Sequence, residues 1–136
     1  MFAADAVAEP ARSYLADGRI VRWHPPDGRP WAIDAELLAQ AVPATLARRT
    51  GVTDPARFWP QWTALETVCK LLDEPVLLRL RRLGLDGGRV DGSRVDGSRV
   101  DGSRTNGIRM WTRCHHGIVV TLGVNLRVPA RASRHR

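Results

Sequence analysis

Residues 34–84 read DAELLAQAVPATLARRTGVTDPARFWPQWTALETVCKLLDEPVLLRLRRLG, and this stretch decides the fold that we expect. It is the only part of the chain that combines sustained helical spacing of apolar residues with residues that start and stop helices. Asp34 predicts a first helix over residues 34–41, because its carboxylate can accept hydrogen bonds from the free amides of a first turn. Pro43 then favours a second helix, and Gly51 ends it in a left-handed conformation.

Prolines divide the rest of the stretch into further helices. The pair Asp54-Pro55 repeats the pattern of a cap followed by proline, and Pro60 predicts a restart after one turn, because proline has no amide hydrogen to donate. Residues 61–73 give the clearest amphipathic pattern, with one apolar face made of Trp62, Leu65, Val68, Cys69 and Leu72. A last helix is expected over 75–84. The sequence therefore predicts a mainly α fold, a small helical cluster of four to five short helices.

A minor β-hairpin is expected before the helices. Two strand-like segments, Gly18–Trp23 and Arg29–Ile33, flank the sequence PPDG, which is a strong turn signal. The hairpin would carry Trp23 and Trp31 onto the helical block. Large indole side chains there would supply apolar area that a small core otherwise lacks.

From Leu85 the chain repeats units of five residues, namely LDGGR, three copies of VDGSR, and TNGIR. A period of five matches neither a strand nor a helix, and the glycine in each unit raises the cost of ordering it. One valine per unit buries too little apolar surface to offset that cost. The sequence therefore predicts a disordered repeat linker.

A C-terminal β-hairpin is expected after the linker. Apolar residues alternate with others along 118–128, which is the period of a strand with one buried face. Residues 108–112 are a candidate partner strand, and 114–117 the connecting loop. An isolated two-stranded hairpin is marginal in water. It must therefore dock on the helices, pair with residues 18–23, or pair with another copy of the chain, which would be self-association through strand 118–128.

These segments divide the 136 residues into four parts. They are a flexible N-terminus (1–17), a helical domain with an N-terminal hairpin (18–84), a disordered linker (85–109), and a C-terminal strand segment with a basic tail (110–136). The formal net charge is +7, and the last segment alone has five arginines and no acid. Such a tail attracts polyanions through phosphate contacts and counterion release. The same preference for arginine also arises in a GC-rich genome without selection for binding.

Several function classes find no support. Two cysteines are too few for a disulfide framework, which suits the reducing cytoplasm. No apolar run reaches the ~20 residues that span a bilayer, and the first residues lack the pattern of a signal peptide. Cys114-His115-His116 are too closely spaced to ligate one zinc ion together. The sequence has no phosphate-binding glycine loop, no nucleophile elbow and no placed pair of carboxylates, so we expect no enzyme and no catalytic residue. We also expect no metal, no cofactor and no membrane partner.

The main functional motif is LARRTGVT at residues 46–53. Small Ala47 allows two helices to approach closely, and Gly51 four residues later supplies a tight turn, which is the spacing of a helix-turn-helix. An arginine followed by two aromatic residues stands at 57–59. On these residues the chain resembles the helix-turn-helix transcription regulators, and it is most similar to the MerR-type group.

The resemblance implies DNA-binding roles for Arg48, Arg49, Thr53 and Arg57. Thr53, Asp54 and Arg57 would lie at the start of the recognition helix, and Arg48 and Arg49 near the phosphates. We therefore expect a small cytoplasmic nucleic-acid-associated protein, a DNA-binding transcription regulator that uses its helical block and basic tail. The alternative is a non-enzymatic protein-interaction module, or the product of an open reading frame without a dedicated ligand.

Overall fold

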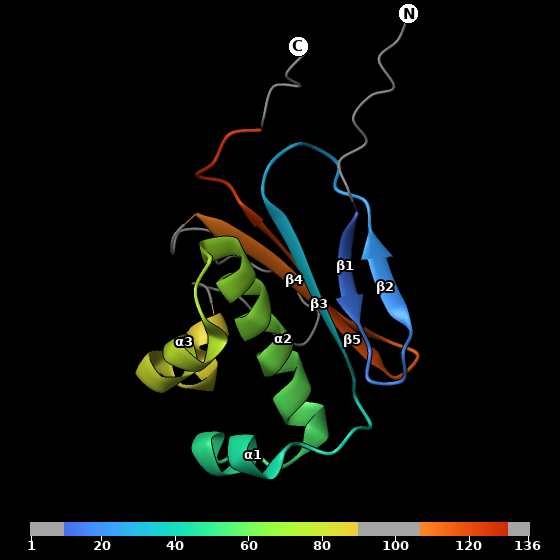
Figure 1. The fold of residues 1–136 in the computed structure, drawn as a ribbon, viewed down its shortest axis with the longest axis vertical. Coiled ribbons are helices and arrows are strands. Elements are labelled where there is room, and N and C mark those ends of the chain that lie inside the picture. Colours follow the sequence, from blue (N-terminus) through green and yellow to red (C-terminus); the bar gives the residue numbers. More distant parts are fainter. Residues whose placement is uncertain (1–9, 90–106, 131–136) are drawn as a thin grey trace, which may run out of the picture.

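The computed structural model describes residues 10–89 and 107–130 (Figure 1). The described elements are β1 (Ala11–Tyr14), β2 (Ile20–Trp23), β3 (Trp31–Leu37), α1 (Ala44–Thr50), α2 (Pro55–Leu72), α3 (Val76–Leu83), a 3-10 turn η1 (Leu85–Gly88), β4 (Ile108–His115) and β5 (Ile118–Asn125). No helix in these ranges has the length and apolar character to cross a bilayer.

The fold is a mixture of helices and sheets, so the predicted mainly α cluster of four to five helices is wrong. Strands β3, β5 and β4 form an antiparallel sheet with β5 in the centre, and β1 and β2 form a separate two-stranded sheet. The long helix α2 packs across one face of the larger sheet, as Figure 1 shows, while α1 and α3 lie to one side and the β1–β2 hairpin lies next to β3.

Strand β3 occupies the place of the first predicted helix. Its residues pair with β5 from Trp31 opposite Val124 to Leu37 opposite Ile118, and residues 32–35 are all buried. The helical spacing of leucines after Asp34 was compatible with a helix, but the same residues also fit a strand with both faces covered. Pairing with a distant strand therefore overrides the local helical preference.

The N-terminal hairpin exists, but with a different partner from the predicted one. Strand β2 pairs with β1, from Ala11 opposite Trp23 to Tyr14 opposite Ile20. The strand after the PPDG turn joins the larger sheet instead, and the predicted flexible N-terminus contains β1. Trp23 does contact Trp31, with ring centroids 4.7 Å apart. Side chains alternate between the two faces along β3, which places Trp31 on the face opposite to α2. Trp23 and Trp31 therefore do not pack on the helices, contrary to the prediction from the sequence.

The helices after residue 43 follow the predicted caps. Helix α1 ends at Gly51, whose φ is 72°, and the Asp54 carboxylate accepts a hydrogen bond from the amide of Ala56 at 3.0 Å. The predicted restart at Pro60 is wrong, because α2 continues through it for 18 residues. Pro60 stands near the beginning of α2, where its missing amide removes one hydrogen bond, and its ring is buried in the core.

Helix α2 is the centre of the hydrophobic core. Four of the five residues of its predicted apolar face are buried, namely Trp62, Leu65, Val68 and Cys69. On the side away from the sheet, η1 packs closely on α2, and a Cβ added at Gly88 would overlap the amide nitrogen of Leu65. The first unit of the five-residue repeat, LDGGR, is therefore part of the fold. The predicted disorder of 90–106 lies outside the described residues.

The C-terminal β-hairpin is confirmed. Strands β4 and β5 are joined by a two-residue turn in which both His116 and Gly117 have positive φ, 48° and 75°, as in the tight turns that suit twisted hairpins. The hairpin both docks on α2 and pairs with β3. Because β4 and β3 take up both edges of β5, that strand has no edge left for another copy of the chain.

Candidate functional site

The four predicted DNA-binding residues lie where α1 leads into α2, and we call them the α1–α2 corner. Arg48 and Arg49 occupy the last turn of α1, Thr53 lies in the connecting loop, and Arg57 lies in the first turn of α2. All four are exposed. Among the described residues, none of the three arginines forms an ion pair. Their guanidinium groups are therefore available to an external anion.

The body of α2 is largely buried. Ten of its residues are buried, starting with Phe58 directly after Arg57. Phe58 packs edge-to-face on Trp59 and parallel to Trp62, with centroid distances of 4.8 and 5.6 Å. A recognition helix has to enter the major groove with its side chains free. Here the sheet and η1 cover most of α2 beyond its first turn, and the exposed residue farther along the helix is Lys70.

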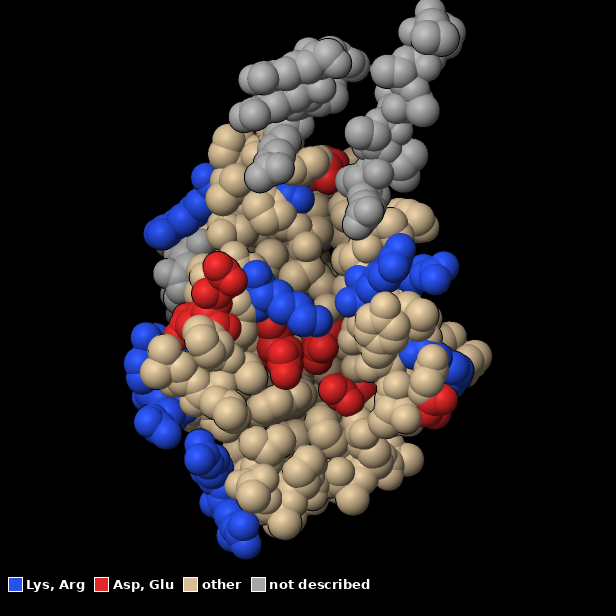
Figure 2. All heavy atoms as spheres, viewed as in Figure 1, with Lys and Arg blue, Asp and Glu red and all other residues tan. Residues whose placement is uncertain are grey.

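Charge is unevenly distributed over the surface that contains the helices. Figure 2 shows basic side chains along the outer side of α1 and α3, whereas acidic side chains gather near the centre, where α2 meets β3. The last turn of α3 contributes Arg81 and Arg82, both exposed. Arg82 pairs with Glu74 at 3.4 Å. The helical flank is thus basic beyond the α1–α2 corner itself.

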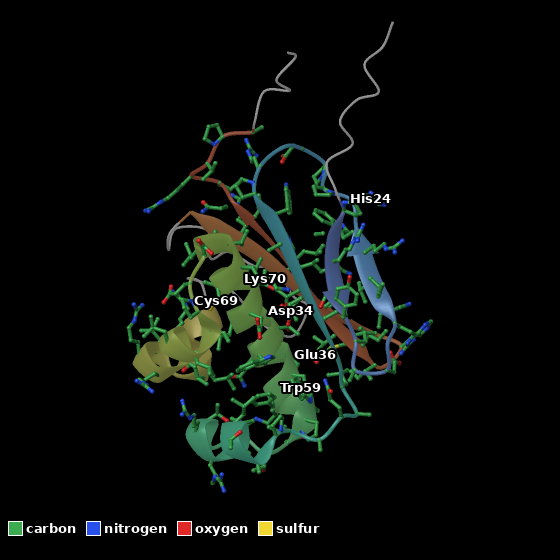
Figure 3. All side chains as sticks on the ribbon, in the orientation of Figure 1. His24, Asp34, Glu36, Trp59, Cys69 and Lys70 are labelled. Carbon is green, nitrogen blue, oxygen red and sulfur yellow. The ribbon has the colours of Figure 1, made fainter. Side chains whose placement is uncertain are left out.

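The central acidic group surrounds one buried carboxylate, Asp34, on the α2 side of β3 (Figure 3). The ammonium of Lys70 donates to the carbonyl oxygen of Ile33 at 2.7 Å and to Asp34 Oδ1 at 3.3 Å. The hydroxyl of Ser13 donates to the same oxygen at 3.4 Å and ties β1 to β3. Asp34 Oδ2 is buried and has no hydrogen-bond partner among the residues that the structure describes.

Burial raises the pKa of Asp34 to about 7, because an ionised carboxylate is poorly solvated there. The positive charge of Lys70 opposes this rise, and the negative charges of Glu66 and Glu36 add to it. Burial also raises the pKa of both glutamates. Asp34 thus changes charge near neutral pH. Its side chain is only 9% exposed, so the arrangement can make the stability of the fold depend on pH.

The cysteines and histidines do not assemble into a site in the described part of the chain, where no group of three or more potential metal ligands occurs. Cys69 is buried, and this burial raises the pKa of its thiol to about 11, which keeps the sulfur protonated and unreactive. Cys114 is exposed. The rings of His115 and His116 stack on each other with centroids 3.8 Å apart.

Sequence reasoning missed the Asp34–Lys70 pair. It interpreted Asp34 as a helix cap. One signal was available, because Lys70 is the only lysine in a chain with twenty arginines. Yet nothing local to Asp34 indicates that α2 lies beside it, because the two residues are 36 positions apart.

Comparisons with protein-family models, with curated proteins and with solved structures found no match.

Proposed function

We propose that this protein associates with nucleic acid through phosphate contacts made by the α1–α2 corner. The observation that carries the proposal is that Arg48, Arg49 and Arg57, at the end of α1 and the start of α2, are each exposed and have no ion-pair partner among the described residues. A guanidinium group without an ion-pair partner attracts phosphate, which it can bind bidentately. The basic last turn of α3 extends the favourable potential.

The proposed mode is mainly electrostatic. Since the body of α2 is buried, side chains that could read base edges are limited to its start, to Thr53 and Arg57. Contacts to phosphates position a protein on nucleic acid but do not read its sequence. A MerR-like regulator would in addition need base contacts from these two residues, and that stays a prediction. The cytoplasm is the proposed compartment, supported by the two free thiols, Cys69 and Cys114.

The proposal predicts a strong dependence on salt. If the three arginines each contact one phosphate, the affinity for duplex DNA should fall about 40-fold between 50 and 200 mM salt, from a slope of about −0.9 per contact. The measurement is fluorescence polarisation of a labelled 20-base-pair duplex titrated with the full chain. Absence of binding at 50 mM salt would refute the proposal.

A matched pair of variants separates this site from net charge. Arg48→Ala with Arg49→Ala should weaken binding and reduce the salt slope by about 2. The control is Arg19→Ala with Arg29→Ala, which removes the same charge from residues that pair with Asp17 and Asp27. The control should affect binding much less. Equal loss in both double variants would show that only total charge matters and would contradict a role for the α1–α2 corner.

A further inference from the structure

Strand β4 carries a second cationic surface on the opposite side of the molecule from α2. Ile108, Met110 and Thr112 are buried. The alternate residues Arg109, Trp111, Arg113 and His115 are exposed, so they point away from α2. Strand β4 is also an edge of the sheet. We call these four exposed residues the β4 face.

The positive charges of the β4 face are not neutralised by the sheet. Arg109 stands opposite Val124 on β5, and Arg113 stands opposite Val120. Neither arginine forms an ion pair within the ranges 10–89 and 107–130. In addition, the chain has no acidic residue after Asp101. Opposite-charge pairs across neighbouring strands stabilise a sheet surface, and within the described part of the chain the charges of this face have no such partner.

An indole lies between the two arginines. The ring of Trp111 stacks on that of Trp31, with centroids 6.1 Å apart and planes 20° apart. The indole nitrogen of Trp31 donates to Asp27 Oδ1 at 2.8 Å, which holds that ring in place. Even with this neighbour, 38% of Trp111 remains exposed. The result is a large aromatic surface that is positioned in advance and partly open.

We propose that the β4 face binds single-stranded nucleic acid, with a base stacked on Trp111 and phosphates held by Arg109 and Arg113. The two arginines are four residues apart on a strand, about 13 Å along it, and the indole lies midway. Cationic groups that follow the backbone beside an aromatic platform are the arrangement that binds single strands, because only an unpaired base exposes its face. This surface is separate from the α1–α2 corner and does not depend on it.

A different interpretation of the arginines is protective. Charged residues on an edge strand hinder pairing with the edge of another chain. In that case their removal would cause self-association through β4 and would leave nucleic-acid binding unchanged. The experiment therefore has to measure both oligomeric state and binding.

The test compares a labelled dT12 oligonucleotide with a 12-base-pair duplex, using the full chain and fluorescence polarisation. Trp111→Ala should weaken binding of the single strand by at least about fivefold, and Trp111→Phe should restore most of it. The double variant Arg109→Ala with Arg113→Ala should weaken binding and reduce its salt dependence. Arg48→Ala with Arg49→Ala should reduce duplex binding while the effect of Trp111→Ala on dT12 persists.

Several results would overturn the proposal. These are no measurable binding of dT12, equal affinity of wild type and Trp111→Ala, or larger particles by light scattering from Arg109→Ala with Arg113→Ala at unchanged affinity. Circular dichroism checks that each variant folds. If Trp111→Ala does not fold, the affinity of Arg109→Ala with Arg113→Ala for dT12 decides the test, because both arginines are exposed.

Discussion

Asp34→Asn is the perturbation that most directly tests the buried polar group between β3 and α2. The amide has nearly the same shape as the carboxyl group but cannot ionise. In the wild type, burial raises the pKa of Asp34 from 3.8 to about 7 in the folded protein. The folded state therefore binds a proton more tightly than the unfolded state does, and this binding stabilises it at low pH.

The direction and size of the expected change in stability with pH follow from the difference in the pKa of Asp34 between the folded and unfolded states. The stabilising contribution is fully present below about pH 4 and is lost as the pH rises to about 7, because the folded protein must then hold a buried carboxylate. A difference of about 3 units corresponds to about 4 kcal/mol, at 1.36 kcal/mol per unit. Relative to Asp34→Asn, the wild type should therefore lose up to about 4 kcal/mol of stability between pH 4 and pH 8.

The assay is urea unfolding followed by tryptophan fluorescence at half-unit steps from pH 4.5 to pH 8.5. Any cost of placing an amide in this position is the same at every pH. The pH dependence of the difference in unfolding free energy between wild type and Asp34→Asn therefore reports the ionisation of Asp34 alone. Asp17→Asn is the control, because Asp17 is exposed on the surface and its pKa is lowered by hydrogen bonds from Arg19. A difference between wild type and Asp34→Asn that stays constant across this range would refute the reasoning.

Two further predictions concern packing and thiol chemistry. Gly88→Ala should destabilise the fold by about 1–3 kcal/mol, because its Cβ would overlap the backbone of Leu65 and push η1 away from α2. The check is thermal unfolding of Gly88→Ala beside Ala56→Gly. Ala56 is exposed in the first turn of α2, so its replacement should cost no more than about 1 kcal/mol. A smaller loss for Gly88→Ala than for Ala56→Gly would contradict the prediction. Of the two thiols, only Cys114 should react rapidly with a disulfide reagent at pH 8, since Cys69 is buried with a pKa of about 11. Fast modification of both thiols in the folded protein would contradict the packing around α2.

Features that depend on neighbouring residues could be predicted from the sequence. Gly51 ends α1 because a residue without a side chain adopts positive φ readily, and Asp54 starts α2 through a hydrogen bond within its own first turn. The alternation along 118–128 predicted β5, and its short connection to β4 followed from adjacency in the chain.

Tertiary structure alone decided the identity of β3, the partner of β2 and the surroundings of Asp34. Residues 34–41 have apolar spacing that fits a helix as well as a buried strand, and the choice was made by pairing with β5, more than eighty positions away. The same pairing placed Asp34 beside Lys70 and put Trp31 next to Trp111. Burial, charge compensation and strand pairing are set by residues distant in the chain, so the pKa of Asp34 and the β4 face emerged only in the folded molecule.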